Sequence, residues 1–450
     1  MKRALLLATL LASTALSANA AKLDITTEYR IRAMAYTNLN LDPLANVDRS
    51  FLSQSARLGF AIKNITLSDN KAEPETMDVV LKLRAIGVAG STTSFQPPFD
   101  VIANQYPNTA FIPFMENAYV RVNNLGGYRW TFTAGRMNYT LGSGLLLDDN
   151  GAGLTGFTAK TQVPWGDFKA EAFGFSAWNS QGTPNSLTVV GLSLEKRGQD
   201  GIWQWNHLFE KDRTEQLFPV NGCAGGCLVS KVQNYFSSVR YKMRYKAIIF
   251  DGEAAIQLGA ATPTGAAPLG NHITTNANAQ VVRAKWKQTF YKDIRGITRI
   301  ILARGSGDDP GTPTTNEAFR PSHGKRFDGL ERVGFGQFFA TTPYDAFGGQ
   351  STATASGLQT GASGIITVGF GITPPSYKGW VLDFDYFLYQ AERNTKAART
   401  LGSEVDFTLR YDFRERFQIH ATAAFFQSGG AVSTVETTAR RFMFEVTGRF

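Results

Sequence analysis

Polar and apolar residues alternate along most of this chain, and the alternation is strictest at its end. The last ten residues read RFMFEVTGRF from Arg441, with aromatic, Val and Gly residues at every second position. A period of two places successive side chains on opposite faces of a β-strand, here one apolar and one wet. A single strand of this kind also fits the edge of a soluble sandwich, so the number of such strands decides between the two folds.

Similar segments recur along the whole chain, and each is close to the roughly 9–11 residues that a tilted membrane strand requires. Their number is even, as in bacterial barrels. We place 18 strands at residues 23–36, 52–64, 77–89, 114–123, 128–141, 154–163, 167–177, 186–196, 202–211, 233–244, 247–258, 276–290, 296–304, 364–373, 380–390, 403–413, 417–426 and 438–450.

The connections between these strands alternate between short and long. Short turns lie at 124–127, 164–166, 197–201, 245–246, 291–295, 377–379 and 414–416, and long segments rich in Gly, Pro, Ser, Thr and Asn lie at 90–113, 212–232, 259–275 and 305–363. Long loops on one rim and short turns on the other are typical of outer-membrane proteins. The sequence predicts an all-β fold, a transmembrane antiparallel β-barrel of about 18 strands with short periplasmic turns and long extracellular loops.

The first 20 residues have the features of a secretory signal peptide. Lys2 and Arg3 precede an apolar run, and Ala18-Asn19-Ala20 is a cleavage site of small residues. The run is too short to cross a bilayer, which takes about 20 residues. We expect residues 1–20 to be removed and 21–450 to form one barrel in the bacterial outer membrane.

The composition adds little chemistry of other kinds. Of 450 residues, 44 are Gly and 33 are Phe, while only two are Cys and four are His. We expect Cys223 and Cys227 to form a disulfide in an oxidising compartment, and we expect no metal and no cofactor. The His residues are scattered and no hydrolase motif is present, so no enzyme is predicted. An outer-membrane hydrolase using the inward-facing His420 is the alternative of a different class.

Cations at every second position mark the inward faces of several strands. Such spacing gathers them on the walls of a water-filled lumen, where they attract anions. The lumen also holds acids, among them Glu28, Glu404 and Glu445, so pairing across strands is the competing explanation for each cation. The candidate pore-lining residues from this pattern are Arg30, Arg32, Arg57, Lys82, Arg84, Arg240, Lys242, Arg283, Lys285, Lys287, Arg410 and Arg441.

Two short motifs resemble the alginate-export family of outer-membrane channels. The first joins ENAYVRV at 116–122 to TAGRMNYTLGSGLLLDDNGAG at 133–153, and the second is FRPSHG at 319–324 followed by FDG at 327–329. The resemblance implies a monomeric barrel that passes an anionic polysaccharide through an arginine-lined constriction partly covered by loops. By motif position, Arg121 and Arg136 would be constriction residues, and Pro321, His323 and Asp328 would belong to a loop motif.

Two structural expectations accompany this hypothesis. Strict alternation from Trp130 would send Arg136 to the lipid side, so we predict a bulge at Gly135 that turns Arg136 and Asn138 inward. The connection 305–363 is longer than loops without a function usually are, and we expect it to form a lid that folds into the lumen. A disordered external loop is the alternative.

The function predicted from the sequence is passive, electrostatically selective passage of an alginate-like anionic polysaccharide or oligosaccharide. The alternative is an anion-preferring porin for small solutes such as sugar acids. Expected partners are an anionic polysaccharide or sugar-acid ligand, outer-membrane lipid and periplasmic export proteins. Nucleic acid is not expected, because the signal peptide directs the chain to the cell envelope.

Overall fold

A computed structural model describes residues 21–41, 47–68, 74–90, 108–149, 151–163, 167–179, 186–213, 216–218, 227–263, 272–291, 294–309, 311–312, 314–322, 335–339, 362–394, 398–433 and 435–450. Within these ranges, no helix is long and apolar enough to cross a membrane. The 3₁₀ turn η1 (Leu125–Gly127) lies between two strands.

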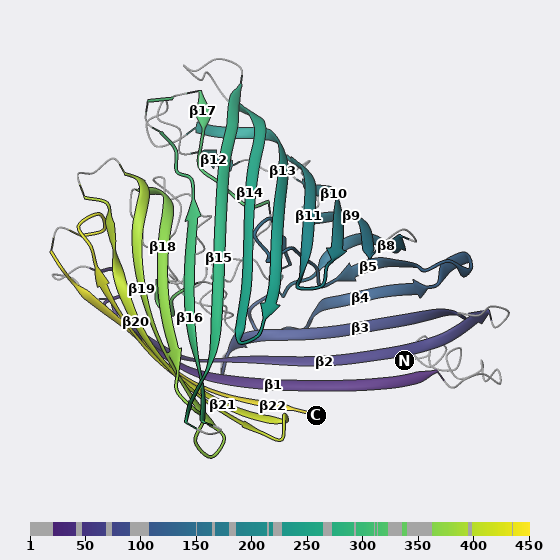
Figure 1. The fold of residues 1–450 in the computed structure, drawn as a ribbon, viewed down its shortest axis with the longest axis horizontal. Helices are drawn as coiled ribbons and strands as arrows, with labels where there is room; N and C mark the ends of the chain where they lie inside the picture. The colour runs from purple at the N-terminus through teal and green to yellow at the C-terminus, as the bar shows by residue number, and fades with distance from the viewer. Residues whose placement is uncertain are drawn as a thin grey trace.

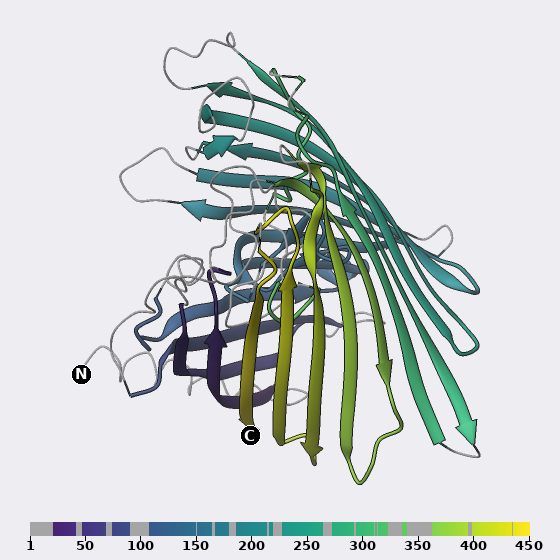
Figure 2. The ribbon, with the colours of Figure 1, turned by 90° about the vertical axis from the view of Figure 1, so that its left-hand side faces the viewer.

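Eighteen long strands, counted over the described residues, form one closed antiparallel barrel (Figures 1 and 2). Each pairs with the next, and β1 pairs with β22 to close the cylinder. The strands are β1 (Lys22–Thr37), β2 (Arg49–Ser68), β3 (Glu75–Val88), β4 (Phe114–Asn123), β5 (Trp130–Met137), β8 (Leu154–Val163), β9 (Phe168–Asn179), β10 (Ser186–Arg197), β11 (Gly201–Asp212), β13 (Cys227–Tyr245), β14 (Ile248–Pro263), β15 (Ile273–Tyr291), β16 (Ile294–Gly305), β18 (Ala362–Thr373), β19 (Trp380–Asn394), β20 (Thr400–Phe413), β21 (Phe417–Ser428) and β22 (Thr438–Arg449).

Four short strands complete the secondary structure of the described residues. β12 (Gln216–Phe218) extends the sheet beside β13, and β17 (Thr315–Asn316) pairs in parallel with β15. β6 (Thr140–Leu141) pairs with β7 (Leu147–Asp148) in a separate hairpin. The predicted fold class and strand order are confirmed.

The alternation in sequence gives the barrel its two faces. On β10, Leu192 and Leu194 are exposed on the outer face, while Ser193 between them is buried. Ser193 donates a hydrogen bond to Asn206 Oδ1 of β11 at 2.8 Å, and Asn206 Nδ2 donates to Ser238 Oγ of β13 at 3.1 Å. Apolar groups therefore face lipid and hydrogen-bonded polar groups face the interior, as the membrane requires.

The short turns close one rim of the barrel. β13 and β14 are joined by Lys246 and Ala247 with Lys246 at a φ of 49°, and the β20–β21 turn has Arg414 and Glu415 at positive φ. Positive φ is typical of the tight turns whose twist matches that of antiparallel strands. Aromatic residues stack on the outer face near this rim, with ring centroids 4.3 Å apart for Trp203 and Tyr241. This rim is the periplasmic one, and the barrel lies in the bacterial outer membrane.

The chain closes on itself through its last residue. Thr27 N donates to Phe450 O at 2.8 Å, and Phe450 N donates to Thr27 O at 2.9 Å. The terminal alternation thus supplies the partner that β1 needs, and the C-terminus in Figure 1 lies at the end of β22 beside β1.

The predicted strand at 128–141 is six residues longer than the observed β5, which ends at Met137. The chain leaves the wall there because the apolar run that follows packs inside the barrel rather than against lipid.

The lipid face can be tested at Leu192, which is 54% exposed near the middle of β10. We expect Leu192→Arg to destabilise the barrel by about 2–4 kcal/mol, because an arginine there faces hydrocarbon. Urea unfolding in lipid vesicles measures this change. Leu192→Ala is the matched control and should cost clearly less, and equal stability of the two variants would contradict the assigned face.

Candidate functional site

Six cations line the inner wall of β22, β1, β2 and β3, and we call them the basic strip: Arg30, Arg32, Arg57, Lys82, Arg84 and Arg449. Strand register brings them together, since Arg57 lies directly opposite Arg84 on β3. Like charges directly opposite each other repel, so carboxylates are needed between them. Three carboxylates pair with arginines of the strip, namely Glu28 of β1, Glu445 of β22 and Glu116 of the neighbouring strand β4.

These carboxylates bridge the arginines in pairs. Glu116 lies 3.2 Å from Arg57 Nε and 3.7 Å from Arg84 Nη1. Glu28 lies 2.7 Å from Arg57 Nη1 and 3.0 Å from Arg449 Nε. Cations outnumber acids within this network, so the wall keeps a positive field even though pairing across strands is real.

Glu445 takes the other two arginines of the strip. It accepts a hydrogen bond from Arg32 Nε, and Arg30 Nε lies 3.9 Å away. Both arginines come from β1, two residues apart, so one carboxylate of β22 holds the pair side by side.

Burial separates the members of the strip. Arg84 is 1% exposed and Arg32 is 7% exposed, so their guanidinium groups are covered. Lys82 is exposed and has no carboxylate within 4 Å in the described chain. A mobile, hydrated ammonium at this position can meet a solute, whereas the buried arginines act through their field.

Lys82 lies between two cavities inside the barrel. The first, of about 690 Å³, is lined on one side by Glu28, Arg57 and Glu116 and opens toward the periplasmic turn at Arg416. The second, of about 460 Å³, is lined by Tyr119, Arg121 and other polar residues. Lys82 and Asn138 line both. The two cavities and Lys82 form the candidate site.

The residues between β5 and β8 fold into the lumen, and we call Asn138–Asp149 with Gly151–Gly153 the inward loop. Leu145, Leu146 and Leu147 at its tip are fully buried among aromatic side chains of the inner wall. Ser143 N donates to Glu253 Oε2 of β14 at 2.8 Å, and Arg240 of β13 donates to the Gly142 carbonyl. The loop therefore reaches from β5 to the wall formed by β13 and β14.

A glycine makes this approach possible. Gly142 has a φ of 61°, and a Cβ there would lie 2.5 Å from Glu253 Oε1. Glycine is therefore needed at this position, because any side chain would push the loop off the wall. This need, and not membership of a family, explains a glycine of the motif at 133–153.

The return of the inward loop is held by hydrogen bonds from arginines of β3 and β5. Arg84 Nη1 donates to Gly151 O at 2.8 Å, and Arg136 Nη2 donates to Ala152 O at 2.6 Å. Asp149 accepts from Gly153 N at 3.1 Å, and burial raises the pKa of this carboxyl. Arg84 and Arg136 thus position the loop beside the candidate site.

The bulge predicted at Gly135 is absent. Pairing of β5 with β4 and with β8 runs without a register shift, and Met137 is buried inside. Arg136 therefore leaves β5 on the outer side with Ala134, and it is not a constriction residue. Gly135 is needed for another reason: a Cβ would lie 2.2 Å from Ala118 O.

Two parts of the connection 305–363 lie inside the barrel. Phe319 is buried with its ring 6.3 Å from that of Phe236 on β13, in an edge-on contact, and Arg320 N donates to Gln257 Oε1 of β14 at 2.9 Å. Pro321 is buried beside them. The loop-motif residues His323 and Asp328 lie outside the described residues, as does Cys223, and the side chain of Cys227 is likewise not described.

The second part is Phe335–Phe339, which we call the peg. Backbone N–H groups of Gln337, Phe338 and Phe339 all donate to the carboxylate of Glu404 on β20, at 2.9 Å for Phe339. Arg441 of β22 donates to the carbonyl and to Oε1 of Gln337. A carboxylate that accepts several backbone N–H groups in a dry site is a strong anchor.

Apolar contacts complete the seat of the peg. The ring of Phe339 stacks on Phe426 of β21 at 4.8 Å and lies 4.9 Å from Tyr389 of β19. Arg283 of β15 lies 5.9 Å from the centre of the Phe335 ring. The predicted pore cations Arg283 and Arg441 therefore both contact the peg.

The remaining predicted cations differ in their surroundings. Arg240 is paired twice with Asp251, at 2.6 and 2.7 Å, and Arg410 is paired with Asp383. Lys242, Lys285 and Lys287 are exposed toward the periplasmic end. Arg299 is an inward-facing cation that is not among the predicted residues, and it binds Asp383 and Asp385 at 2.9 Å each. The alternation of the strand could have identified Arg299 as an inward-facing residue, because its neighbours Thr298 and Ile300 face outward.

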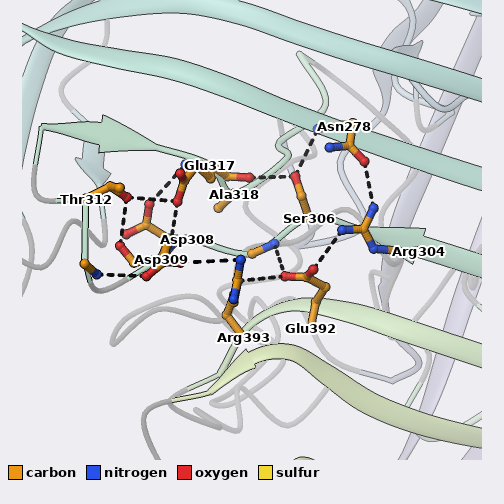
Figure 3. Close-up of polar contacts among 12 residues, drawn as sticks. Asn278, Arg304, Ser306, Asp308, Asp309, Thr312, Glu317, Ala318, Glu392 and Arg393 are labelled. Carbon is orange, nitrogen blue, oxygen red and sulfur yellow. Dashed lines mark hydrogen bonds and ion pairs between the residues drawn. The ribbon is translucent and has the colours of Figure 1, made fainter.

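A polar cluster anchors the start of the same connection at the extracellular rim (Figure 3). Asp308 accepts from Glu317 N at 3.0 Å, and Glu317 accepts from Asp309 N at 2.9 Å. Burial raises the pKa of Asp308 to about 7, with the Glu317 and Asp309 carboxylates adding to the rise. In the described part of the chain, no group of His, Cys, Asp and Glu could hold a metal ion.

Solved structures of the same fold are outer-membrane proteins. The chain aligns with Acinetobacter baumannii OccAB1 at a TM-score of 0.54 and 10% identity, covering 95% of this chain and 97% of that one. It aligns with OccAB4 of the same organism at 0.52 and 11%, covering 96% and 100%. A BenF-like porin from Pseudomonas fluorescens Pf-5 gives 0.50 and 11%, covering 95% and 99%. No family model matches the sequence, and neither does any curated protein.

These comparisons overturn the resemblance to the alginate-export family. Over almost the full chain the matching barrels are Occ-type and BenF-like porins. The motif at 133–153 misled because its Gly, Leu and Asp residues build the inward loop, and its Arg136 holds that loop by backbone contacts.

Asp308 makes the rim cluster sensitive to pH. Its folded pKa of about 7 exceeds the ordinary value of 3.8, so the cluster binds a proton more tightly than an open loop does. Stability of the cluster should fall as pH rises from about 4 to 7, by up to tenfold in the opening constant per pH unit, and then level off. Amide exchange of 306–318, corrected for intrinsic rates, measures this. Asp308→Asn should flatten the dependence, and an unchanged slope would refute it.

The peg is tested at Glu404. We expect Glu404→Gln to weaken its seat by about 1.5–3 kcal/mol, because charge-assisted bonds from three N–H groups are lost. Single-channel conductance should rise or fluctuate more. Asp412→Asn, on the same inward face of β20 but exposed, is the control. The same conductance for wild type and Glu404→Gln would show that the peg does not limit flow.

Proposed function

We propose that this protein is an outer-membrane porin for small anionic solutes, carboxylates in particular. The observation that carries the proposal is the pair of cavities meeting at Lys82. Arg57 and Arg449 of the basic strip also line the first cavity, and Arg121 and Lys160 also line the second. A cleft in which cations outnumber carboxylates raises the local concentration of anionic solutes.

The size of the free space favours small solutes over a polymer. The inward loop, Phe319 and the peg occupy the lumen, and cavities of about 690 and 460 Å³ are in the range of small-molecule sites. A polysaccharide would need an uninterrupted passage longer than either. One structure of the same fold is Pseudomonas aeruginosa OpdK with vanillate, at a TM-score of 0.50 and 12% identity, covering 95% of this chain and 98% of that one. Vanillate is a small carboxylate, which agrees with the proposed solute class.

The selectivity would arise in two ways. The buried arginines set a fixed positive field along β1 to β3. Lys82, with Arg121 in the second cavity, would meet the carboxylate directly. Arg121 Nε lies 3.4 Å from Thr133 Oγ1 and its guanidinium lies 5.3 Å from the Tyr119 ring, an arrangement that also suits a ring-bearing acid.

A hydrolase is the competing class, and it would depend on His420. That residue lies on the inner face of β21 with Nε2 3.3 Å from Thr422 Oγ1, opposite Glu445, which Arg32 already engages. A passive channel needs no turnover, so incubation with sugar-acid esters and oligouronates should give no product that depends on His420.

Lys82 provides the test of the proposed function. We expect Lys82→Gln to lower the anion-to-cation permeability ratio severalfold and to weaken current block by small carboxylates, because a hydrated cation is lost from the junction of the cavities. Reversal potentials in planar bilayers under a salt gradient measure the ratio. Lys246→Gln, at a periplasmic turn, is the control. An unchanged ratio would refute the site, and faster liposome permeation by oligouronates than by glucuronate would refute the solute class.

A further inference from the structure

The outer face of the barrel carries a compact group of cations at the extracellular ends of β11 and β13. Its members are Lys211, Arg213 and Lys231, all exposed, and we call them the rim patch. We propose that the rim patch binds the phosphate groups of a phosphorylated glycolipid in the outer leaflet. This inference rests on the barrel and its membrane position and not on the transport function.

Strand alternation sorts the charges at this edge by sign. Lys211 and Arg213 are exposed, whereas Glu210 and Asp212 beside them are each 4% exposed and face inward. Glu210 Oε1 accepts a hydrogen bond from Asn234 Nδ2 at 2.7 Å within the barrel. The acids are therefore turned away from the cations next to them in sequence, and among the described residues at this edge the outer face carries positive charge alone.

An irregularity in β13 places the third cation. The register with β14 shifts between Ser230 and Gln233, which leaves an extra residue on β13. Lys231 occupies this bulge with a φ of 54°, a conformation that is uncommon for a side chain of this size. Bulges re-aim side chains at sheet edges. The adjacent pair Asp212–Val232 sets Lys231 level with Arg213 across the strands.

The depth of the rim patch matches the lipid head-group region. Trp203 and Tyr241 stack in the periplasmic aromatic belt, and Lys211 is eight residues further along β11. At about 3.3 Å per residue and a tilt near 40°, Lys211 lies about 20 Å above that belt, with Arg213 higher still. The apolar band of such barrels is about 25 Å tall, so these cations lie where it meets the outer-leaflet head groups.

The rim patch differs from two other outward-facing cations at this rim. Arg304 of β16 is paired with Glu392 at 2.8 Å, and Arg440 of β22 has no second cation on the neighbouring outward positions Thr37 and Phe425. Across the described ranges, Lys211, Arg213 and Lys231 have no carboxylate within 4 Å. A phosphate can therefore be bound without displacing an acid.

The surface below the patch suits the rest of such a lipid. Phe209 and Tyr235 lie directly opposite each other one step toward the membrane centre, with Val190 beside Phe209. Their side chains are exposed apolar surface against which acyl chains can pack. Free phosphate would use only the cations, whereas a glycolipid would use both regions, and this combination favours the lipid.

The experiment compares purified wild-type protein with the variant Lys211→Gln/Arg213→Gln/Lys231→Gln. Native mass spectrometry or a fluorescence titration in detergent measures binding of bisphosphorylated lipid A. Each cation near an anionic lipid surface contributes about fivefold to binding, so the triple variant should bind at least about tenfold more weakly. Lys246→Gln/Arg295→Gln/Lys378→Gln removes three exposed cations from the periplasmic rim and should bind like wild type.

Further arms separate the sources of the phosphate. Dephosphorylated lipid A should bind wild type and the triple variant equally weakly, and inorganic phosphate should compete poorly. Equal affinity of wild type and the triple variant for bisphosphorylated lipid A would overturn the proposal, as would efficient competition by inorganic phosphate. Heat-modifiable migration in gels checks that each variant is folded, and Lys231→Gly, which suits the backbone at the bulge, gives a third variant that should also bind more weakly.

Discussion

The architecture of this protein depends on the pairing of every backbone hydrogen-bonding group within the membrane. A strand in a bilayer cannot leave N–H and C=O groups unpaired, because hydrocarbon offers no partner for them. The sheet must therefore close, and closure depends on β1 meeting β22 and on Thr27 exchanging hydrogen bonds with Phe450. Once closed, every strand has one face to lipid and one to the lumen, so charged side chains gather inside.

Cations that gather inside the barrel repel one another, and carboxylates of the inner wall that each contact two arginines offset this repulsion. Arg57 and Arg84 lie opposite each other, and Glu116 lies between them. Breaking such a shared network would leave buried charge uncompensated, which costs more than an intact pair contributes. The same arginines therefore stabilise the inner wall and contribute to the positive potential of the lumen. A cation that is held in place by a carboxylate still contributes to the potential of the passage when cations outnumber acids.

The period of two predicted the strands well because it is a local consequence of membrane burial. The strands at 114–123 and 154–163 were placed at their observed limits for this reason. The wall assignments of Arg30, Lys82 and Arg240 follow from the same rule.

The segments that lie inside the lumen, the inward loop and the peg, could not be predicted from the period of two. Gln337 N bonds to Glu404 across 67 positions, and Ser143 N bonds to Glu253 across 110. Nothing in the local pattern encodes such partners. Arg136 shows how this misleads: its neighbours in sequence suggested a pore residue, but its function is to bind the carbonyl of a loop that has no periodicity. Three leucines at 145–147 carried the better signal, since an apolar run between strands must be buried somewhere.

The barrel wall and the two segments inside the lumen, the inward loop and the peg, contribute differently to the selection of solutes. The wall is rigid because each strand is paired on both sides, so its charges provide a constant field. The inward loop and the peg are held by individual side-chain anchors, which are Glu253, Arg240, Arg84 and Arg136 for the loop and Glu404 and Arg441 for the peg. Local opening free energies are lower where contacts are few. Passage of solutes larger than the cavities would therefore depend on the anchors, while preference for anions would depend on the wall, and the two properties can change independently in such a barrel.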